Sequence, residues 1–269
     1  MRRPTQYEPL ATRAVFAILA GAARPVMNLF MNRTWYGMDK IPDGCIVVSN
    51  HNTEIDPLTV GHALYATGKY PRFLAKKALF DVPVVGKLLS LAGQVPVDRG
   101  GPGAGVSLDE ATRQLERGGC IVVYPEGTLT RDPDLWPMRG HTGAARLALR
   151  TGAPVIPVVH WGDQELFPRY GKMIRPFPRK RAVVSVGEEI DLSEFRGKPL
   201  TRHVLADATD TIIRALTRDL VALRGGTPPE HPFDPLHDGA GEAGRRNAPG
   251  HGAGSGAETI KQQRNEEEA

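Results

Sequence analysis

The chain reads Val155-Ile156-Pro157-Val158-Val159 near its middle, an unbroken apolar run that follows the helical pattern of Thr142–Arg150. A continuous run rich in β-branched residues is typical of a strand that is covered on both faces. Similar runs alternate with amphipathic stretches from Ile46 to Val186. This alternation predicts an α/β fold: a single domain with a largely parallel central sheet flanked by helices.

The expected elements are short. We expect strands at Cys45–Ser49, Arg72–Ala75, Gln94–Val97, Cys120–Tyr124, Val155–His160 and Ala182–Val186. We expect helices at Pro57–Ala66, Val84–Ala92, Ser107–Arg117, Thr142–Arg150 and Arg202–Leu223. In sheets of this kind, functional side chains collect at the carboxyl ends of the strands.

Charge is unevenly distributed over the 269 residues. The formal net charge is +4, but residues 225–269 contain four Lys/Arg and eight Asp/Glu, so residues 1–224 carry +8. A basic body attracts polyanions such as nucleic acid, phosphorylated metabolites or an anionic lipid surface. Residues 225–269 are rich in Gly and Pro and lack apolar periodicity, so we expect a disordered tail after a domain at 34–224.

Residues 1–33 combine apolar side chains with arginines. The run Ala14–Ala23 is shorter than the roughly 20 residues of a spanning helix, and Arg24-Pro25 follows it. The composition favours a pair of helices lying in the headgroup region of a membrane. A helix packed on the protein's own core and a signal peptide are the alternatives. The only two cysteines, Cys45 and Cys120, begin apolar runs and are expected to be buried thiols in a reducing compartment.

A histidine and an aspartate follow the first expected strand, in Ser49-Asn50-His51-Asn52-Thr53-Glu54-Ile55-Asp56-Pro57. Histidine accepts a proton near neutral pH, and a carboxylate bonded to its other ring nitrogen fixes the tautomer. Within one helix, His51 and Asp56 would point to different faces, so the chain must turn between them. Asp56-Pro57 is typical of a helix start, and Asp56 as a simple helix cap is the alternative.

Two further polar segments follow expected strands. Arg99 enters a glycine-rich turn, where a guanidinium can bind a phosphate with two N–H groups, although a solvated loop arginine is equally allowed. Glu126, Gly127 and Thr128 follow the strand at Cys120–Tyr124 and are typical of a polar binding turn or of a plain turn.

Together these segments resemble the glycerol-phosphate acyltransferase superfamily and, within it, the 1-acyl-sn-glycerol-3-phosphate acyltransferase family. The four blocks that carry the resemblance are His51–Asp56, Gly93–Arg99, Pro125–Thr128 and Val155–Val158. Their order and spacing agree with the family from roughly Trp35 to Leu192.

The resemblance implies that His51, oriented by Asp56, deprotonates the acceptor hydroxyl, which attacks the thioester of acyl-CoA or acyl-carrier protein. It implies no metal and no cofactor. It assigns substrate contacts to Arg99, Glu126, Gly127, Thr128 and, more weakly, Lys76. It also implies a lysophospholipid acceptor and a peripheral location on the cytoplasmic face of the cell membrane.

The sequence departs from the family at two places. The third block often continues with arginine, whereas Leu129 stands here and the next arginine is Arg131, which could bind the phosphate in its place. Relatives often carry lysine at the position of His141, which we interpret as a loop or helix-start residue.

Other functions remain open at this stage. The acceptor could instead be glycerol-3-phosphate, another lysophospholipid or a glycolipid. A serine hydrolase is unsupported because no Gly-x-Ser-x-Gly motif occurs. A non-catalytic lipid-binding or nucleic-acid-binding protein is the rival from another class. No nucleic-acid module accompanies the basic segment Arg175–Arg181, which favours a solvated or membrane-facing loop.

Overall fold

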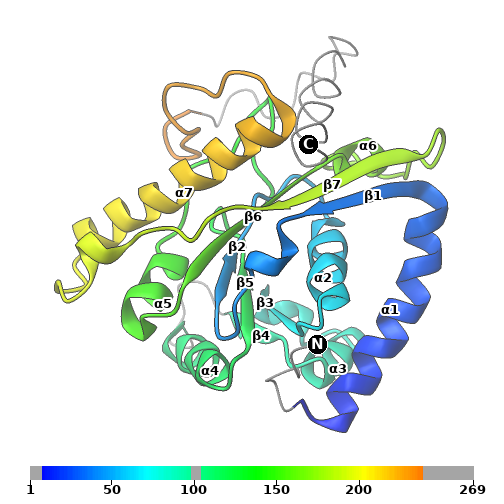
Figure 1. Ribbon diagram of the computed structural model, residues 1–269, viewed down its shortest axis with the longest axis horizontal. Helices are drawn as coiled ribbons and strands as arrows, with labels where there is room; N and C mark the ends of the chain where they lie inside the picture. The colour runs from blue at the N-terminus through cyan, green and yellow to red at the C-terminus, as the bar shows by residue number, and fades with distance from the viewer. Residues whose placement is uncertain (1–7, 98–103, 239–269) are drawn as a thin grey trace, which may run out of the picture.

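The computed structural model describes residues 8–97 and 104–238. Seven strands form one sheet in the order β1-β7-β6-β2-β5-β3-β4 (Figure 1). The strands are β1 (Met31–Tyr36), β2 (Ile46–Val48), β3 (Pro71–Lys76), β4 (Val95–Val97), β5 (Cys120–Val123), β6 (Val155–Trp161) and β7 (Lys180–Val186). All neighbouring pairs are parallel except β6 and β7, which confirms the predicted α/β fold with a largely parallel sheet.

Helices cover both faces of the sheet (Figure 1). They are α1 (Leu10–Phe30), α2 (Asp56–Ala66), α3 (Val85–Leu91), α4 (Ala104–Glu116), α5 (Gly143–Thr151), α6 (Asp163–Leu166) and α7 (Arg202–Arg224). The hydrophobic core consists of separate clusters of buried side chains, and successive residues of β2 belong to two of them. Ile46 is in the cluster that includes residues of α5 and α7, and Val47 is in the cluster that includes residues of α2. Because side chains of a strand alternate between faces, burial on both faces explains the continuous apolar runs in the sequence.

The parallel strands end at one edge of the sheet. Strands β2, β5 and β6 lie side by side, so the loops that follow Val48, Val123 and Trp161 emerge there together. Strand β7 runs in the opposite direction to β6, so β7 begins at this same edge. Residues that are far apart in the sequence are therefore neighbours at this edge.

The N-terminal segment differs from the expected helix pair. A single helix, α1, runs from Leu10 to Phe30 and contains Pro25. By length and composition α1 could cross a membrane, with 21 residues and a mean hydropathy of 1.4 over an 18-residue stretch. The prediction was wrong because Pro25 was taken to end a helix at Arg24, whereas the exposed helix continues through the proline.

The chain also enters the sheet earlier than expected. Strand β1 begins at Met31, before the predicted domain boundary at residue 34, and pairs in parallel with β7. The sequence of β1, MNRTWY, does not alternate between apolar and polar residues. The strand is therefore recognisable only from its pairing with β7.

The expected tail begins with an ordered segment. The backbone N–H of Arg139 donates to the carbonyl of Phe233 at 2.9 Å, and Arg139 forms an ion pair of 2.6 Å with Asp234. The prediction of disorder is therefore wrong for residues 225–238, because these contacts hold the segment against the domain. Residues 239–269 lie outside the described part of the chain.

Candidate functional site

His51 and Asp56 meet in the loop between β2 and α2. Nδ1 of His51 lies 3.0 Å from Oδ2 of Asp56. The two side chains converge because the chain turns after β2 and begins α2 at Asp56. In the tautomer that this contact favours, Nδ1–H donates to the carboxylate and Nε2 is free to accept a proton.

The carboxylate of Asp56 points back toward the loop that precedes it. Its Oδ2 also accepts the backbone N–H groups of Asn52 at 2.5 Å and Thr53 at 2.8 Å. No side chain caps the first turn of α2. Asp56 is fully buried, so its oxygen organises the His51 loop and does not act as the simple helix cap that the sequence allowed.

The imidazole of His51 is held on one face by an aromatic ring and is open to solvent. It stacks on Tyr124 with a centroid distance of 4.1 Å and an interplanar angle of 21°. The side chain is 16% exposed, and its Nε2 has no hydrogen-bond partner among the described residues. An oriented and accessible nitrogen of this kind can accept a proton from a bound hydroxyl.

Glu126 connects the His51 loop to a second loop. Its Oε1 accepts the backbone N–H of His51 at 3.1 Å, and its Oε2 accepts that of Met138 at 3.0 Å. The side chain is 1% exposed, and burial raises its pKa to about 8 although both backbone donors oppose the shift. These contacts give Glu126 a role in holding the His51 loop, and its predicted contact with substrate stays a prediction.

The turn after β5 completes the support of His51. The backbone carbonyl of His51 accepts the N–H of Thr130 at 2.7 Å. Gly127 has φ 72°, a conformation that L side chains rarely adopt, so this turn requires glycine. Gly127 and Thr128 are half-buried, beside the buried Glu126. The turn therefore fixes the backbone on both sides of the imidazole.

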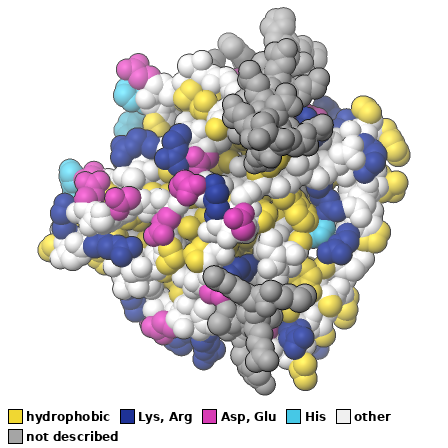
Figure 2. Space-filling view, in the orientation of Figure 1, with side chains coloured by type: hydrophobic (Ala, Val, Ile, Leu, Met, Phe, Trp, Pro, Cys, Tyr) yellow, Lys and Arg dark blue, Asp and Glu magenta, His cyan; other side chains and the backbone are white. Residues whose placement is uncertain are grey.

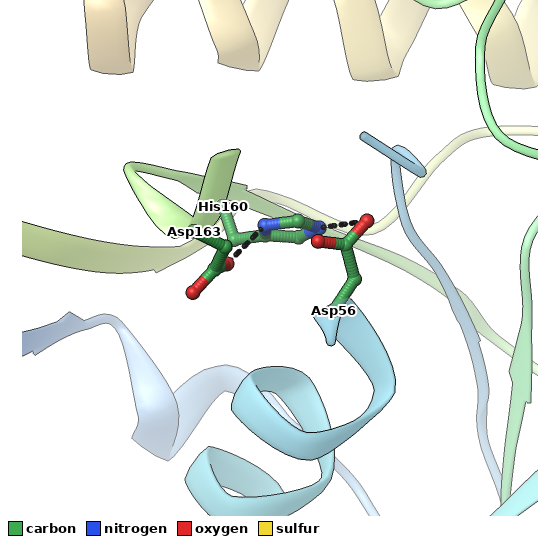
Figure 3. A group of neighbouring side chains, drawn as sticks. All are labelled: Asp56, His160 and Asp163. Carbon is green, nitrogen blue, oxygen red and sulfur yellow. Dashed lines mark ion pairs between the residues drawn. The ribbon is translucent and has the colours of Figure 1, made fainter. Parts of the chain in front are cut away.

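A second histidine lies behind Asp56. Figure 3 shows the imidazole of His160, at the end of β6, between the carboxylates of Asp56 and Asp163. Nε2 of His160 lies 3.6 Å from Oδ2 of Asp56, and Nδ1 lies 2.8 Å from Oδ2 of Asp163. Nε2 also lies 2.9 Å from the backbone carbonyl of Asn50. All three side chains of this buried triad, Asp56, His160 and Asp163, are fully buried.

The surrounding oxygens favour a charged His160. Burial alone lowers the pKa of His160, but the charges of Asp56 and Asp163 and the hydrogen bond to Asp163 outweigh it and raise the pKa to about 9. The three side chains bring potential ligand atoms within 4.8 Å of one another, as a metal site would. However, both ring nitrogens face oxygen acceptors, which suits an imidazolium, whereas a metal needs an unprotonated nitrogen.

No described side-chain contact joins Lys76, Arg131 or His141 to His51. Arg99 falls outside the described residues. Lys76 is exposed at the end of β3. Arg131 is exposed, whereas Leu129 is buried. His141 is exposed, and its backbone N–H donates to the carbonyl of Pro125 at 2.8 Å.

Three residues of the site were missed in the sequence. Tyr124 was read only as the end of a strand, and His160 and Asp163 were given no role. The available signal was position, because His160 ends a buried strand at the same edge as His51. A search of all strand ends for ionisable side chains would have found the pair.

Comparisons with known proteins find acyltransferases. The sequence model of the family described as Acyltransferase matches residues 32–161. A chloroplastic 1-acyl-sn-glycerol-3-phosphate acyltransferase of Brassica napus is 32% identical over 136 residues, which are 49% of this chain and 38% of that relative. A 1-acyl-sn-glycerol-3-phosphate acyltransferase of Bacillus subtilis is 25% identical over 74% of this chain and 93% of the relative.

The chain thus spans less than two thirds of the plant relative's length and nearly all of the bacterial one. A crystal structure of the 1-acyl-sn-glycerophosphate acyltransferase from Thermotoga maritima aligns with a TM-score of 0.59 and 24% identity. The alignment covers 78% of this chain and 80% of that one. This likeness concerns the fold.

Proposed function

Residues 32–161 form a domain of the acyltransferase family, and from this premise we propose that the chain transfers a fatty acyl group to a lysophospholipid. The acceptor is the free hydroxyl of 1-acyl-sn-glycerol-3-phosphate, the substrate that the names of the plant and bacterial relatives give. The donor is a thioester, acyl-CoA or acyl-carrier protein. The observation that carries the proposal is the 3.0 Å contact between His51 and Asp56, which leaves Nε2 of His51 without a hydrogen-bond partner in the described part of the chain.

In the reaction, Nε2 of His51 removes the proton from the acceptor hydroxyl as its oxygen attacks the thioester carbonyl. The resulting imidazolium is stabilised by Asp56 through Nδ1–H. Collapse of the tetrahedral intermediate breaks the carbon–sulfur bond, and the imidazolium returns the proton to the departing thiolate. General-base catalysis of this kind accelerates a reaction by about 10²–10⁴-fold, and the rest comes from positioning and oxyanion stabilisation.

The charges around Asp56 suit a base that becomes positive. With His51 neutral, the buried triad holds two carboxylates and one imidazolium, for a net charge of −1. When His51 takes the proton, the four side chains together become neutral. The site therefore favours the protonated base in the transition state, where the positive charge first develops.

The other substrate contacts follow the family blocks. Arg99 binds the phosphate of the acceptor, because a guanidinium can donate two parallel hydrogen bonds to phosphate oxygens. Gly127 and Thr128 line the acceptor, next to the turn that supports His51. We place the enzyme on a membrane surface, at its cytoplasmic face as the family resemblance implies. The exposed apolar side chains of α1, including Ile18 and Leu29, support contact with a membrane.

A panel of acceptors tests the proposed function. The full chain would be incubated with radiolabelled acyl-CoA and with glycerol-3-phosphate, lysophosphatidic acid or a neutral lysolipid. The highest kcat/KM is expected for lysophosphatidic acid. A higher value for another acceptor would reassign the substrate, and no transfer to any acceptor from either thioester donor would refute the proposal.

A further inference from the structure

A pocket of about 300 Å³ opens where α1 meets β1 and the segment before β7. It is lined by Asn28, Met31, Asn32, Arg33, Trp35 and Arg179. The site around His51 uses none of these residues. The pocket is at the lower end of the size range for small-molecule sites and is large enough for a phosphate headgroup.

The pocket carries positive charge that no carboxylate balances. Arg33 and Arg179 line it, and Arg24 lies close enough to Arg33 to affect its ionisation. None of these three arginines forms an ion pair with an Asp or Glu within residues 8–97 and 104–238. Burial and the nearby Arg24 lower the pKa of Arg33, so an anion in the pocket would relieve both costs.

Neighbouring groups hold the arginines in place without neutralising them. His62 of α2 contacts Nη1 of Arg33 through Nδ1 and accepts Nε–H of Arg24 at 3.3 Å. Burial, Arg33 and Arg24 lower the pKa of His62 to about 4, so it is neutral at pH 7. Arg179 donates Nη2–H to the carbonyls of Asn28 at 2.7 Å and Met31 at 3.2 Å. Its other N–H groups have no partner in the described part of the chain.

The elements that line the pocket also expose apolar side chains. Val26 and Leu29 of α1 are 54% and 57% exposed, and Phe177, two residues before Arg179, is 71% exposed. Phe177 contacts Phe30 edge to face, with ring centroids 6.2 Å apart. In Figure 2, hydrophobic side chains follow the outer edge of α1, and Lys, Arg and His side chains gather between α1 and α2. Exposed apolar groups beside arginines that no described carboxylate pairs with suit a phosphate at the surface of a bilayer better than a phosphate ion in water.

We propose that this pocket binds the phosphate of an anionic phospholipid in the bilayer while the exposed apolar side chains of α1 and Phe177 insert among the acyl chains. The inference rests on the proposed function for the membrane location. The bound lipid is distinct from the acceptor, because no residue that lines the pocket forms a described hydrogen bond or ion pair with His51 or Asp56. Ile55, next to Asp56, packs against a small apolar cluster that contains Met27 of α1 and Met31 of β1. Because this cluster links the His51 loop to the elements that line the pocket, the bound lipid orients the loop toward the membrane.

Vesicle sedimentation tests the proposal. The full chain would be titrated with phosphatidylcholine vesicles, with and without phosphatidylglycerol. The Arg33→Gln/Arg179→Gln variant is compared with Arg202→Gln/Arg214→Gln, which makes the same charge change at exposed positions of α7. We expect the pocket variant to lose about 25-fold in affinity for anionic vesicles, about fivefold for each arginine, and the control to lose less than threefold.

Two outcomes would overturn the proposal. An equal loss in both variants would indicate general electrostatic attraction. Saturable binding of inorganic phosphate by the wild-type chain, with no preference for anionic vesicles, would indicate a site for a soluble anion. If the double variant unfolds, Arg179→Glu takes its place, because Arg179 is exposed. Acyl transfer in detergent micelles is measured in parallel, so an inactive wild-type chain would refute the proposed function and leave the vesicle comparison valid.

Discussion

Replacing Asp56 with Asn removes a charge and preserves the shape of the side chain. In the structure, Oδ2 of Asp56 accepts from Nδ1 of His51 and from the backbone N–H groups of Asn52 and Thr53. An amide oxygen in the same place still accepts the two backbone groups, and the amide NH₂ takes the position of Oδ1, which has no hydrogen-bond partner among the described residues. The loop should therefore keep its conformation, so that the variant isolates the effect of charge.

The size of the effect follows from the distances. At 3.0 Å and an effective dielectric constant of about 20, an imidazolium and a carboxylate attract each other by about 5 kcal/mol. The charge of His160, 3.6 Å from the same oxygen, would then face the protonated His51 with no anion between them. We expect kcat of Asp56→Asn to fall by about 10³–10⁴-fold, because about 1.4 kcal/mol corresponds to each factor of ten.

The assay is the initial rate of acyl transfer from radiolabelled acyl-CoA to lysophosphatidic acid at saturating concentrations. Asp210→Asn, an exposed substitution on α7, provides the matched control and should retain the wild-type rate. Thermal unfolding of each variant shows whether the fold is intact. A decrease in kcat of less than tenfold for a folded Asp56→Asn protein would refute the electrostatic role of Asp56.

Three further changes probe the surroundings. Burial raises the pKa of Glu126 from its ordinary value of 4.5 to about 8. Between these pH values the folded protein keeps the proton on Glu126 and the unfolded chain loses it, so the free energy of unfolding should fall as the pH rises from 4.5 to 8. In urea titrations, Glu126 should contribute a decrease of at most about 1.4 kcal/mol in the free energy of unfolding per pH unit, and Glu126→Gln should abolish this contribution. The same pH dependence in the wild type and in Glu126→Gln would contradict the raised pKa. His160→Gln leaves Asp56 and Asp163 without their cation, so we expect a loss of about 3–5 kcal/mol in the free energy of unfolding. An unchanged kcat in a folded His160→Gln protein would leave His160 a purely structural role. Arg99→Ala should raise KM for lysophosphatidic acid more than it lowers kcat, and an unchanged KM would show that another group binds the phosphate.

The sheet was predictable from the sequence where burial alone determines the pattern. Strands β2, β5 and β6 are apolar on both faces, so their runs appear as uninterrupted Val and Ile. Strand β1 was missed because Asn32, Arg33 and Thr34 interrupt the apolar pattern, and pairing with β7 compensates for this. Helix α1 was predicted to break at Arg24, although an exposed proline can be accommodated within a helix.

The local half of the site was also predictable. His51 and Asp56 lie five residues apart, and Asp56-Pro57 signalled the turn that joins them. The other half is assembled from distant segments: Tyr124 comes from the end of β5 and His160 from the end of β6. No spacing rule connects these residues to His51, because only the order of strands in the sheet brings them together.

The claim on which the function depends is that Nε2 of His51 takes the proton of the acceptor hydroxyl. The most direct test measures kcat for acyl transfer to lysophosphatidic acid in His51→Ala, with the exposed His141→Ala as the matched control. We predict that His51→Ala stays folded and loses at least about 10²-fold in kcat, whereas His141→Ala remains within a few-fold of wild type. A folded His51→Ala protein that transfers acyl groups at the wild-type rate would contradict the mechanism.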